Sequence, residues 1–213
     1  MIFNDRFQAG LTLADKLSNL NLNSKNSIIA AIPRGGVIVA EAISQKLTIP
    51  LKAVVIKKLG APYNSELAIG AVSAFGKPVL DNWLIANLNV GKSYLKREIN
   101  KKRKEALKRE KFLNSQIKER DFQKKTVIVV DDGLATGQTA KAASRVLRSF
   151  KIKKIILAVP CASPATIDSV KEYFDEIVCP AVDENLQAVG QFYKDFSQVD
   201  DEQVKDILDR ARI

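Results

Sequence analysis

The chain has 213 residues, of which 46% are hydrophobic, and a formal net charge of +10. This length and composition suit a single domain with an ordinary buried core. There is no run of about 18 consecutive apolar residues, so neither a membrane-spanning helix nor a membrane partner is expected. The sequence has no histidine, which excludes the usual general base and the commonest metal ligand.

The first residues lack the layout of a secretory signal peptide, and the two cysteines, Cys161 and Cys179, form no metal-binding pattern. Both lie at the ends of predicted strands, so we expect them to be buried free thiols. These features favour a reducing, cytoplasmic location.

The chain begins with a helix, followed by a strand, a loop and a second helix. Apolar residues recur every three or four positions from 3 to 20, which predicts an amphipathic helix with Arg6 on its solvent side. Residues 27–32 predict a short buried strand, and residues 37–43 predict a helix. The loop between them consists of Pro33, Arg34, Gly35 and Gly36. Its glycines permit a close approach of the backbone to a ligand, and its arginine suits bidentate contact with a phosphate.

The next stretch predicts a strand, a loop and a hairpin. The strand is expected at 51–56, and the loop at 57–66 opens with Lys57-Lys58 and is rich in turn-forming residues. Residues 67–73 and 78–81 then predict the two strands of a hairpin.

Residues 91–120 carry most of the positive charge. They hold 12 Lys and Arg against 4 Asp and Glu, a balance of +8, which leaves +2 for the other 183 residues. The pattern predicts one long helix from Ser93 to about Glu119 with a thin apolar stripe. We consider two interpretations: a solvated helix lying across the sheet or at a dimer interface, and a contact with nucleic acid.

The stretch from Val127 to Thr139 carries the strongest signal. Four apolar residues predict a strand buried on both faces, and Asp131 and Asp132 follow at its carboxyl end, where open α/β sheets bind ligands. The next residues open a helix and offer N–H groups and hydroxyls to an anion. These residues are Ala135, Thr136, Gly137, Gln138 and Thr139. The glycine patterns of Walker A and Rossmann sites are absent.

The rest of the chain continues the alternation of helices and strands. Helices are expected at 138–150 and 164–173 and strands at 154–159 and 175–179, with a last helix reaching Arg212. This alternation predicts an α/β fold with a doubly wound, mainly parallel sheet. The aromatic residues near position 193 have two open interpretations: a wall for a ring-shaped substrate, or docking of the C-terminal segment onto the core.

The Val127–Thr139 stretch resembles the phosphoribosyl-pyrophosphate (PRPP) signature of the type I phosphoribosyltransferases. The order of Pro-Arg-Gly-Gly, Lys-Lys-Leu-Gly-Ala-Pro, Glu-Leu-Ala-Ile-Gly-Ala, the signature and Ala-Val-Gly-Gln-Phe-Tyr is similar to a little-characterised group of bacterial and archaeal phosphoribosyltransferases. The resemblance implies one domain over 1–213, with 91–120 as a long basic helical insertion and 183–213 as a C-terminal hood or tail.

The resemblance also implies a role for each motif. Asp131 and Asp132 would contact the ribose hydroxyls and, through them or through water, Mg²⁺. Residues 135–139 would hold the 5′-phosphate of PRPP. The pyrophosphate would be held by the basic and glycine residues Arg34, Gly35, Gly36, Lys57 and Lys58, the two lysines lying on a mobile loop that closes over the site. A hood containing Phe192 and Tyr193 would cover the acceptor.

The expected reaction is a Mg²⁺-dependent transfer of phosphoribose from PRPP to a nitrogenous acceptor such as a nucleobase, carried out by a homodimer. Hypoxanthine–guanine enzymes carry an Asp at the position of Ala135 and adenine enzymes an Ala, so the acceptor stays open. Two alternatives are a PRPP-sensing regulator that binds nucleic acid through 91–120 and a degenerate enzyme without turnover. The retained contacts to the leaving group favour the enzyme. Asp132→Asn is then expected to lower turnover far more than stability.

Overall fold

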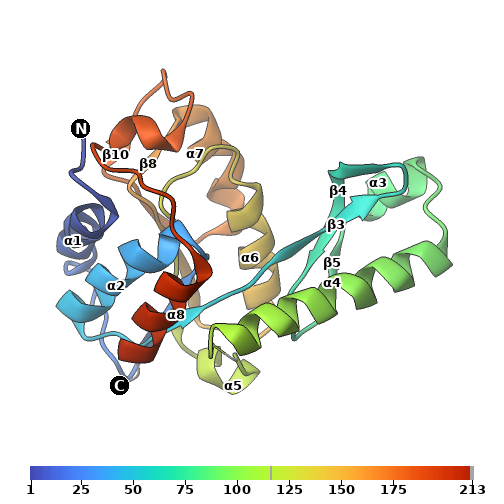
Figure 1. The fold of residues 1–213 in the computed structure, drawn as a ribbon, viewed down its shortest axis with the longest axis horizontal. Helices are drawn as coiled ribbons and strands as arrows, with labels where there is room; N and C mark the ends of the chain where they lie inside the picture. The colour runs from blue at the N-terminus through green and yellow to red at the C-terminus, as the bar shows by residue number, and fades with distance from the viewer. Residues whose placement is uncertain (116, 212–213) are drawn as a thin grey trace.

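The computed structural model describes residues 1–115 and 117–211. At its centre is a parallel sheet with the strand order β2-β1-β6-β7-β9. The strands are β1 (Ser27–Ala31), β2 (Leu51–Ala53), β6 (Thr126–Val130), β7 (Lys154–Ala158) and β9 (Glu176–Val178). Helices cover both faces of this sheet (Figure 1). The predicted doubly wound, mainly parallel α/β fold is confirmed.

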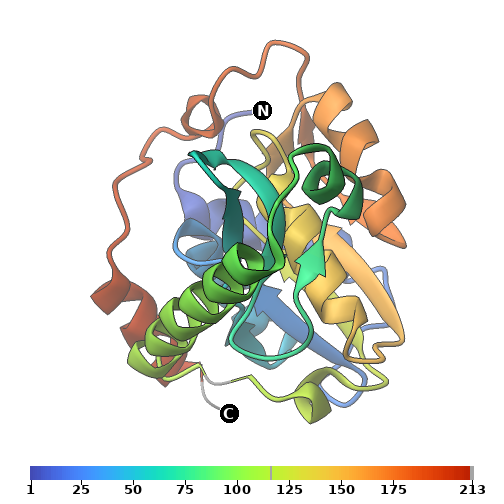
Figure 2. The same ribbon diagram turned by 90° about the vertical axis from the view of Figure 1, so that its right-hand side faces the viewer.

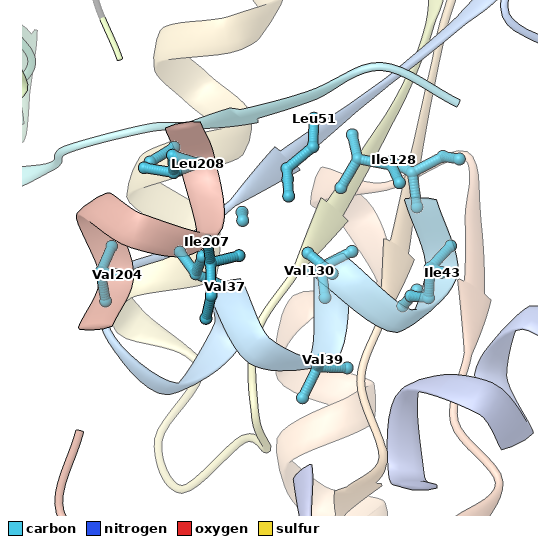
Figure 3. Packing of buried hydrophobic residues seen from close by; sticks show 14 of the residues in the cluster. Val37, Val39, Ile43, Leu51, Ile128, Val130, Val204, Ile207 and Leu208 are labelled. Atoms are coloured by element: carbon cyan, nitrogen blue, oxygen red, sulfur yellow. The ribbon is translucent and has the colours of Figure 1, made fainter. Parts of the chain in front are cut away.

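Side chains of successive residues in the central strands point to opposite faces, and each face has its own core. Ile128 and Val130 of β6 face α1 (Arg6–Leu17), α2 (Gly35–Leu47) and α8 (Asp201–Arg210). In Figure 3 these two side chains lie beside Val37, Val39 and Ile43 of α2, with Val204, Ile207 and Leu208 of α8 nearby.

The second core lies on the opposite face of the sheet. Val127 and Val129 of β6 face α6 (Gln138–Arg148) and α7 (Pro164–Val170). The central strand is therefore buried on both sides, as its unbroken apolar run predicts.

Between β2 and β6 the chain builds a projecting lobe, residues 57–112, which we call the arm (Figures 1 and 2). Its antiparallel sheet pairs β3 with β4 and β4 with β5, and its own small core includes Leu59 and Ile69. The elements of the arm are β3 (Lys57–Ala61), β4 (Asn64–Val72), β5 (Val79–Leu80), α3 (Asn82–Asn87) and α4 (Lys92–Phe112). The predicted hairpin is confirmed by the β4–β5 pairing.

Two predictions about the arm are wrong. Residues 57–61 form a strand rather than a loop, because they pair with β4 and Leu59 packs in the arm core. The long helix ends at Phe112 instead of near Glu119, because Asn114 adopts a left-handed backbone (φ 50°). Gln116 lies outside the described residues, and a separate short helix, α5 (Glu119–Phe122), follows.

The expected C-terminal hood or tail, residues 183–213, divides into two parts. Its helix α8 packs against α2 and contributes to the main core, while η2 (Val189–Phe192) lies near β8 (Cys161–Ala162). β8 pairs in parallel with β10 (Ala181–Val182), and η1 (Lys171–Tyr173) follows α7. The predicted helix end at Arg212 lies outside the described residues.

The two cysteines are free, as predicted: Cys161 is buried and Cys179 half-buried. Burial raises the pKa of the Cys161 thiol to about 12 and that of Cys179 to about 11, so both are inert structural thiols. In the described part of the chain, no helix has the length and apolar character needed to cross a membrane.

Candidate active site

Two loops predicted to bind ligand meet at one edge of the central sheet. β1 and β6 are neighbours in parallel register, with Ala31 opposite Val130, so the loops that follow them emerge side by side. The Ile32 N–H donates to the carbonyl oxygen of Val130 at 2.8 Å and holds the two exits together. The site therefore lies at the carboxyl ends of the strands, where connections leave the sheet in opposite directions.

The glycines of the first loop allow it to lie directly against the aspartates. A side chain at Gly35 would overlap the Asp132 carboxylate, and one at Gly36 would lie 2.8 Å from the Cα of Asp131. The peptide bond between Pro33 and Arg34 is cis. Gly35 and Gly36 thus permit a close approach, as predicted, between the two site loops.

Two helices begin at this edge without a side-chain cap. α2 begins after Arg34 and α6 after Gly137, and neither N-cap residue provides a capping side chain. By contrast, Asp5, Ser163 and Asp200 cap α1, α7 and α8. Uncapped N–H groups and the helix dipole attract anions, so the site offers two anion positions.

The loop after β6 surrounds a cleft of about 240 Å³. The cleft is lined by Asp131, Asp132, Gly133, Leu134, Ala135, Thr136, Gly137, Gln138, Thr139, Ala140 and Val189. All five residues predicted to bind a 5′-phosphate are therefore brought together with both aspartates. Four residues of this lining were not predicted to be site residues: Gly133, Leu134 and Ala140 of the same segment, and Val189 from η2.

Neighbouring elements hold this loop in place. The Thr166 hydroxyl, on α7, donates to the carbonyl oxygen of Ala135 at 3.0 Å, and the Leu134 N–H donates to that of Cys161 at 2.9 Å. Gly137 has φ +69°, and a side chain there would overlap Val170, so this turn requires glycine. The loop is therefore anchored to α7 and β8 and has a defined conformation at Gly137.

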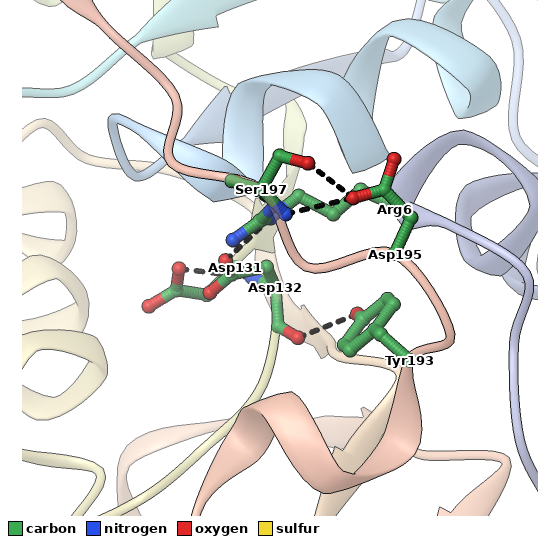
Figure 4. A network of polar contacts seen from close by, with 6 residues as sticks. All are labelled: Arg6, Asp131, Asp132, Tyr193, Asp195 and Ser197. Carbon is green, nitrogen blue, oxygen red and sulfur yellow. Dashed lines mark hydrogen bonds and ion pairs between the residues drawn. The ribbon is translucent and has the colours of Figure 1, made fainter.

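Asp132 is held by Arg6 of α1 and by residues of the segment 193–197, which precedes α8 (Figure 4). Arg6 Nε lies 2.8 Å from Asp132 Oδ2, and the other end of the guanidinium donates to the carbonyl oxygen of Ser197 at 2.9 Å. The same guanidinium stacks 3.8 Å from the centre of the Phe196 ring. The Tyr193 hydroxyl donates to the backbone carbonyl of Asp132 at 2.7 Å.

The prediction that Arg6 is solvated is wrong, because only 8% of this residue is exposed. Arg6 lies on the same helix face as Gly10, Leu13 and Leu17, all of which are buried. Their spacing was the available signal, since residues three, four and seven positions apart share a face. Tyr193 and Phe192 are also buried and lie behind the cleft instead of lining it.

The neighbouring carboxylates have different environments. Asp131 Oδ1 accepts a hydrogen bond from the Asp132 N–H at 2.9 Å and has no ion pair within the described residues. Burial, and then the charge of Asp132, raise the pKa of Asp131 well above its usual range. The site thus combines one ion-paired carboxylate, Asp132, with a second, Asp131, that lines the cleft without an ion pair in the described part of the chain.

The three basic residues predicted to bind pyrophosphate are not all in one place. Arg34 is exposed at the start of α2, and no carboxylate in the described part of the chain pairs with it. Lys57 is half-buried at the base of the arm. Lys58 lines a separate pocket between the arm and α6.

Comparison with known proteins now assigns the family. A family model described as "Phosphoribosyl transferase domain" matches residues 4–196, which include both site loops and the Arg6–Asp132 pair. The chain belongs to the phosphoribosyltransferase family. This finding confirms the resemblance drawn from the Asp131-Asp132 motif.

The chain is similar to proteins from several bacteria. Two Mycobacterium tuberculosis proteins, each named "Putative phosphoribosyl transferase", are 35% identical over 219 residues, which cover 99% of this chain and 47% of theirs. The chain thus spans about half the length of those relatives. A uracil phosphoribosyltransferase from Clostridioides difficile is 42% identical over a shorter stretch of 72 residues. This stretch covers 33% of this chain and 34% of that protein.

Among solved structures, the crystal structure of TT1426 from Thermus thermophilus is similar over almost the whole chain. It is 37% identical, covers 98% of each chain and superposes with a TM-score of 0.86.

Proposed function

We propose that this phosphoribosyltransferase transfers the phosphoribosyl group of PRPP to a nitrogenous acceptor and releases pyrophosphate. The observation that carries the proposal is the meeting of two uncapped helix N-termini with two adjacent carboxylates at one sheet edge. A sugar with a phosphate at each end needs this arrangement: two anion sites and, between them, acceptors for hydroxyl groups.

Each part of the site has a role in the proposed reaction. Residues 135–139 hold the 5′-phosphate at the N-terminus of α6, and Asp131 and Asp132 accept hydrogen bonds from the ribose hydroxyls. Arg34, Gly35 and Gly36 hold the pyrophosphate at the N-terminus of α2. We retain Lys57 and Lys58 as proposed pyrophosphate contacts.

The chemistry then depends on positioning and fixed charge. As the bond between ribose C1 and the pyrophosphate oxygen breaks, its electron pair leaves with pyrophosphate and positive charge develops on the sugar. The acceptor nitrogen forms the new bond to C1, and the proton that this nitrogen carried is released to solvent. Arg34 and the N–H groups of α2 stabilise the departing charge, and the carboxylate of Asp132 lies beside the cationic ribose.

Magnesium is part of the proposal. In the described part of the chain, no cluster of three or more acidic, Cys or His side chains offers a complete metal site. Asp131 and Asp132 suit an ion that keeps several waters and takes other oxygens from its phosphate ligands, as Mg²⁺ does. When bound, it would neutralise charge on the pyrophosphate.

The acceptor is proposed to be a nucleobase or a similar ring. Val189 provides an apolar surface in the cleft. Ala135 offers no carboxylate to a purine N7, and the similarity of one segment to a uracil phosphoribosyltransferase keeps pyrimidines among the candidates.

We further propose that the protein is a cytoplasmic homodimer. Tyr63 and Trp83 are among the most exposed large hydrophobic residues, both lie on the arm, and none of the six residues of α3 is buried. Exposed large apolar residues are candidates for contacts between subunits. The two free thiols suit a reducing compartment.

Isothermal titration with PRPP and Mg²⁺, followed by a pyrophosphate-release assay with a panel of nucleobases, tests the function. We expect PRPP to bind the wild-type chain. Arg34→Gln should weaken binding at least tenfold, because a hydrogen bond to a charged group contributes about 1.5–3 kcal/mol. It should also slow release about 100-fold, the usual effect of removing one fixed donor.

Arg97→Gln is the matched control, since Arg97 is an exposed arginine on α4, outside both loops of the site. It should behave like the wild type. Absence of PRPP binding to folded, Mg²⁺-supplied protein would overturn the proposed function. Binding without pyrophosphate release for any acceptor would replace it with a binding protein that has no turnover.

A further inference from the structure

A second pocket, distinct from the cleft at the aspartates, lies between the arm and α6 and has a volume of about 200 Å³. We propose that this pocket is a binding site for a diphosphate group, either free pyrophosphate or the diphosphate of a nucleotide. The inference does not depend on the proposed transfer reaction. Lys58 and Gln138 occur in both proposals, but Lys141 and Arg145, which carry the test, belong to this pocket alone.

The walls of the pocket carry three positive charges from two parts of the fold. Lys141 and Arg145 stand one turn apart on α6, and Lys58 faces them from β3. The floor on the arm side is made of small residues such as Ala68 and Gly70. The small floor leaves open space between the cations.

None of these three cations is neutralised within the described part of the chain. Lys58, Lys141 and Arg145 form no ion pair with a carboxylate there, although nine other ion pairs occur. Arg145 donates to the hydroxyl of Tyr173 at 2.9 Å, and both α6 cations lie over the ring of Tyr173. Tyr173 orients the two side chains without cancelling their charge.

The single acid in the lining does not neutralise this charge either. Asp81 caps α3, where its carboxylate accepts the Leu84 N–H at 2.9 Å. Even when Asp81 carries a full negative charge, the lining has three positive charges and one negative charge. Arg148, on the next turn of α6, differs because it pairs with Asp175.

Size and charge together select the ligand class. Pockets for whole drug-sized molecules are about 300–1,000 Å³, so a 200 Å³ pocket suits a smaller group. Lysine and arginine side chains converging from two walls suit an anion that has oxygens on several sides. A diphosphate group meets both conditions.

The position of the pocket gives such a ligand access to the phosphate loop. Gln138, the first residue of α6, lines both this pocket and the cleft at Asp131. A diphosphate bound here would also bridge β3 and α6, which belong to the arm and the core.

The test counts bound ligands by isothermal titration at about 0.15 M salt, which screens weak surface attraction. Inorganic pyrophosphate and ADP are titrated separately into the wild type, Lys141→Gln/Arg145→Gln and the control Lys104→Gln/Lys108→Gln. The control removes two exposed positive charges at the same spacing on α4. PRPP binding and circular dichroism are measured on the same samples.

We expect the pocket variant to bind one pyrophosphate fewer per chain than the control, with PRPP affinity within twofold of the wild type. If the pocket variant loses ADP binding as well as pyrophosphate binding, the site is assigned to nucleotide diphosphates. If it loses pyrophosphate binding alone, the site is assigned to the free anion. Ala68→Met, which fills the pocket without changing charge, should give the same loss and serves if the double variant does not fold.

Two results would overturn the inference: identical pyrophosphate stoichiometry in the pocket variants and the control, or a parallel loss of PRPP binding, which would make these residues part of the active site. If neither the wild type nor any variant binds PRPP, only the proposed transfer function fails. The comparison of pyrophosphate stoichiometry then still tests the proposed diphosphate site.

Discussion

Because Arg6 forms an ion pair with Asp132, a substitution of Asp132 affects stability as well as activity. The Arg6 guanidinium pairs with Asp132 at 2.8 Å, with side-chain exposures of 10% and 18%. Asp132→Asn would therefore leave a buried arginine without its counter-charge and reduce stability as well as activity. The expectation that this substitution spares stability does not fit the structure. Asp131, which has no ion pair within the described residues, is the better position for a functional Asp→Asn test.

A double-mutant cycle on the pair measures this coupling. Arg6→Gln and Asp132→Asn should each lower the free energy of unfolding by about 3–5 kcal/mol, because each leaves one buried charge unpaired. The double variant should lose less than the sum by about 1–3 kcal/mol. Urea denaturation provides the measurement.

The exposed pair Lys171–Asp168, in which both side chains are about 70% exposed, is the control for that cycle. Its coupling energy should not exceed about 1 kcal/mol. Additive losses at Arg6 and Asp132 would contradict the structural role assigned to their pair.

Glu110 is a second residue whose environment controls its charge. It is fully buried on α4, and burial raises its pKa to about 8. The Ile117 backbone N–H and the charge of Lys52 act in the opposite direction without offsetting burial. In the unfolded chain the pKa of a glutamate is about 4.3. At a pH between about 4.3 and about 8, Glu110 therefore holds a proton in the folded state and has lost it in the unfolded state.

The free energy of unfolding should thus fall as pH rises from about 5 to about 8. Glu110→Gln should remove about 3 kcal/mol of that fall, since one pKa unit corresponds to about 1.4 kcal/mol. Urea denaturation at the two pH values measures it. Glu105→Gln, on the same helix but paired with Lys102, should leave the slope unchanged; an unchanged slope in Glu110→Gln would refute the assignment.

At the scale of elements, the arm explains the charge of residues 91–120. The Arg103 guanidinium donates to the Gly76 carbonyl at 2.7 Å, and Arg109 pairs with Asp201 of α8 at 2.7 Å. These cations hold α4 against the arm and the core. The apolar residues Tyr94, Leu95 and Ile99 of the same helix pack on the arm core. Part of the positive charge is therefore structural, which weakens the nucleic-acid interpretation.

The exposed surface of the arm predicts the oligomeric state. Trp83 is 73% exposed on α3, so Trp83→Ser should change stability by only about 0.5 kcal/mol. Size-exclusion chromatography with light scattering should show a dimer for the wild type and a monomer for this variant.

Phe112→Ser is the control, because Phe112 is 40% exposed at the core end of α4, beside Lys205. This variant should remain dimeric. A monomeric wild type, or a Trp83→Ser variant that is still a dimer, would exclude a homodimer formed through the arm.

At the scale of the whole molecule, the N-terminal segment meets residues 192–194, which precede α8, beside the site. The Phe3 N–H donates to the Phe192 carbonyl at 2.8 Å, and the Lys194 N–H donates to the Phe3 carbonyl at 2.9 Å. Phe3 and Tyr193 also contact each other as rings, 5.7 Å between centres. These contacts tie the segment that carries Tyr193 to the N-terminal segment that carries Arg6.

The sequence by itself determined the central sheet, the helices that cover it and the two loops proposed to bind PRPP. The apolar run before Asp131, the glycines after Arg34 and the Thr136–Thr139 turn are local patterns, and neighbouring residues impose their conformation. Parallel register then placed both loops at one edge.

Only the tertiary structure decided which distant groups meet. Arg6 and Asp132 are 126 positions apart, and the pairing of Lys57 with Val72 turned an expected loop into a strand. Val189 likewise reaches the cleft from the C-terminal segment. Such contacts depend on partners outside any local window, because burial and ion pairing are properties of the folded chain rather than of the spacing along it.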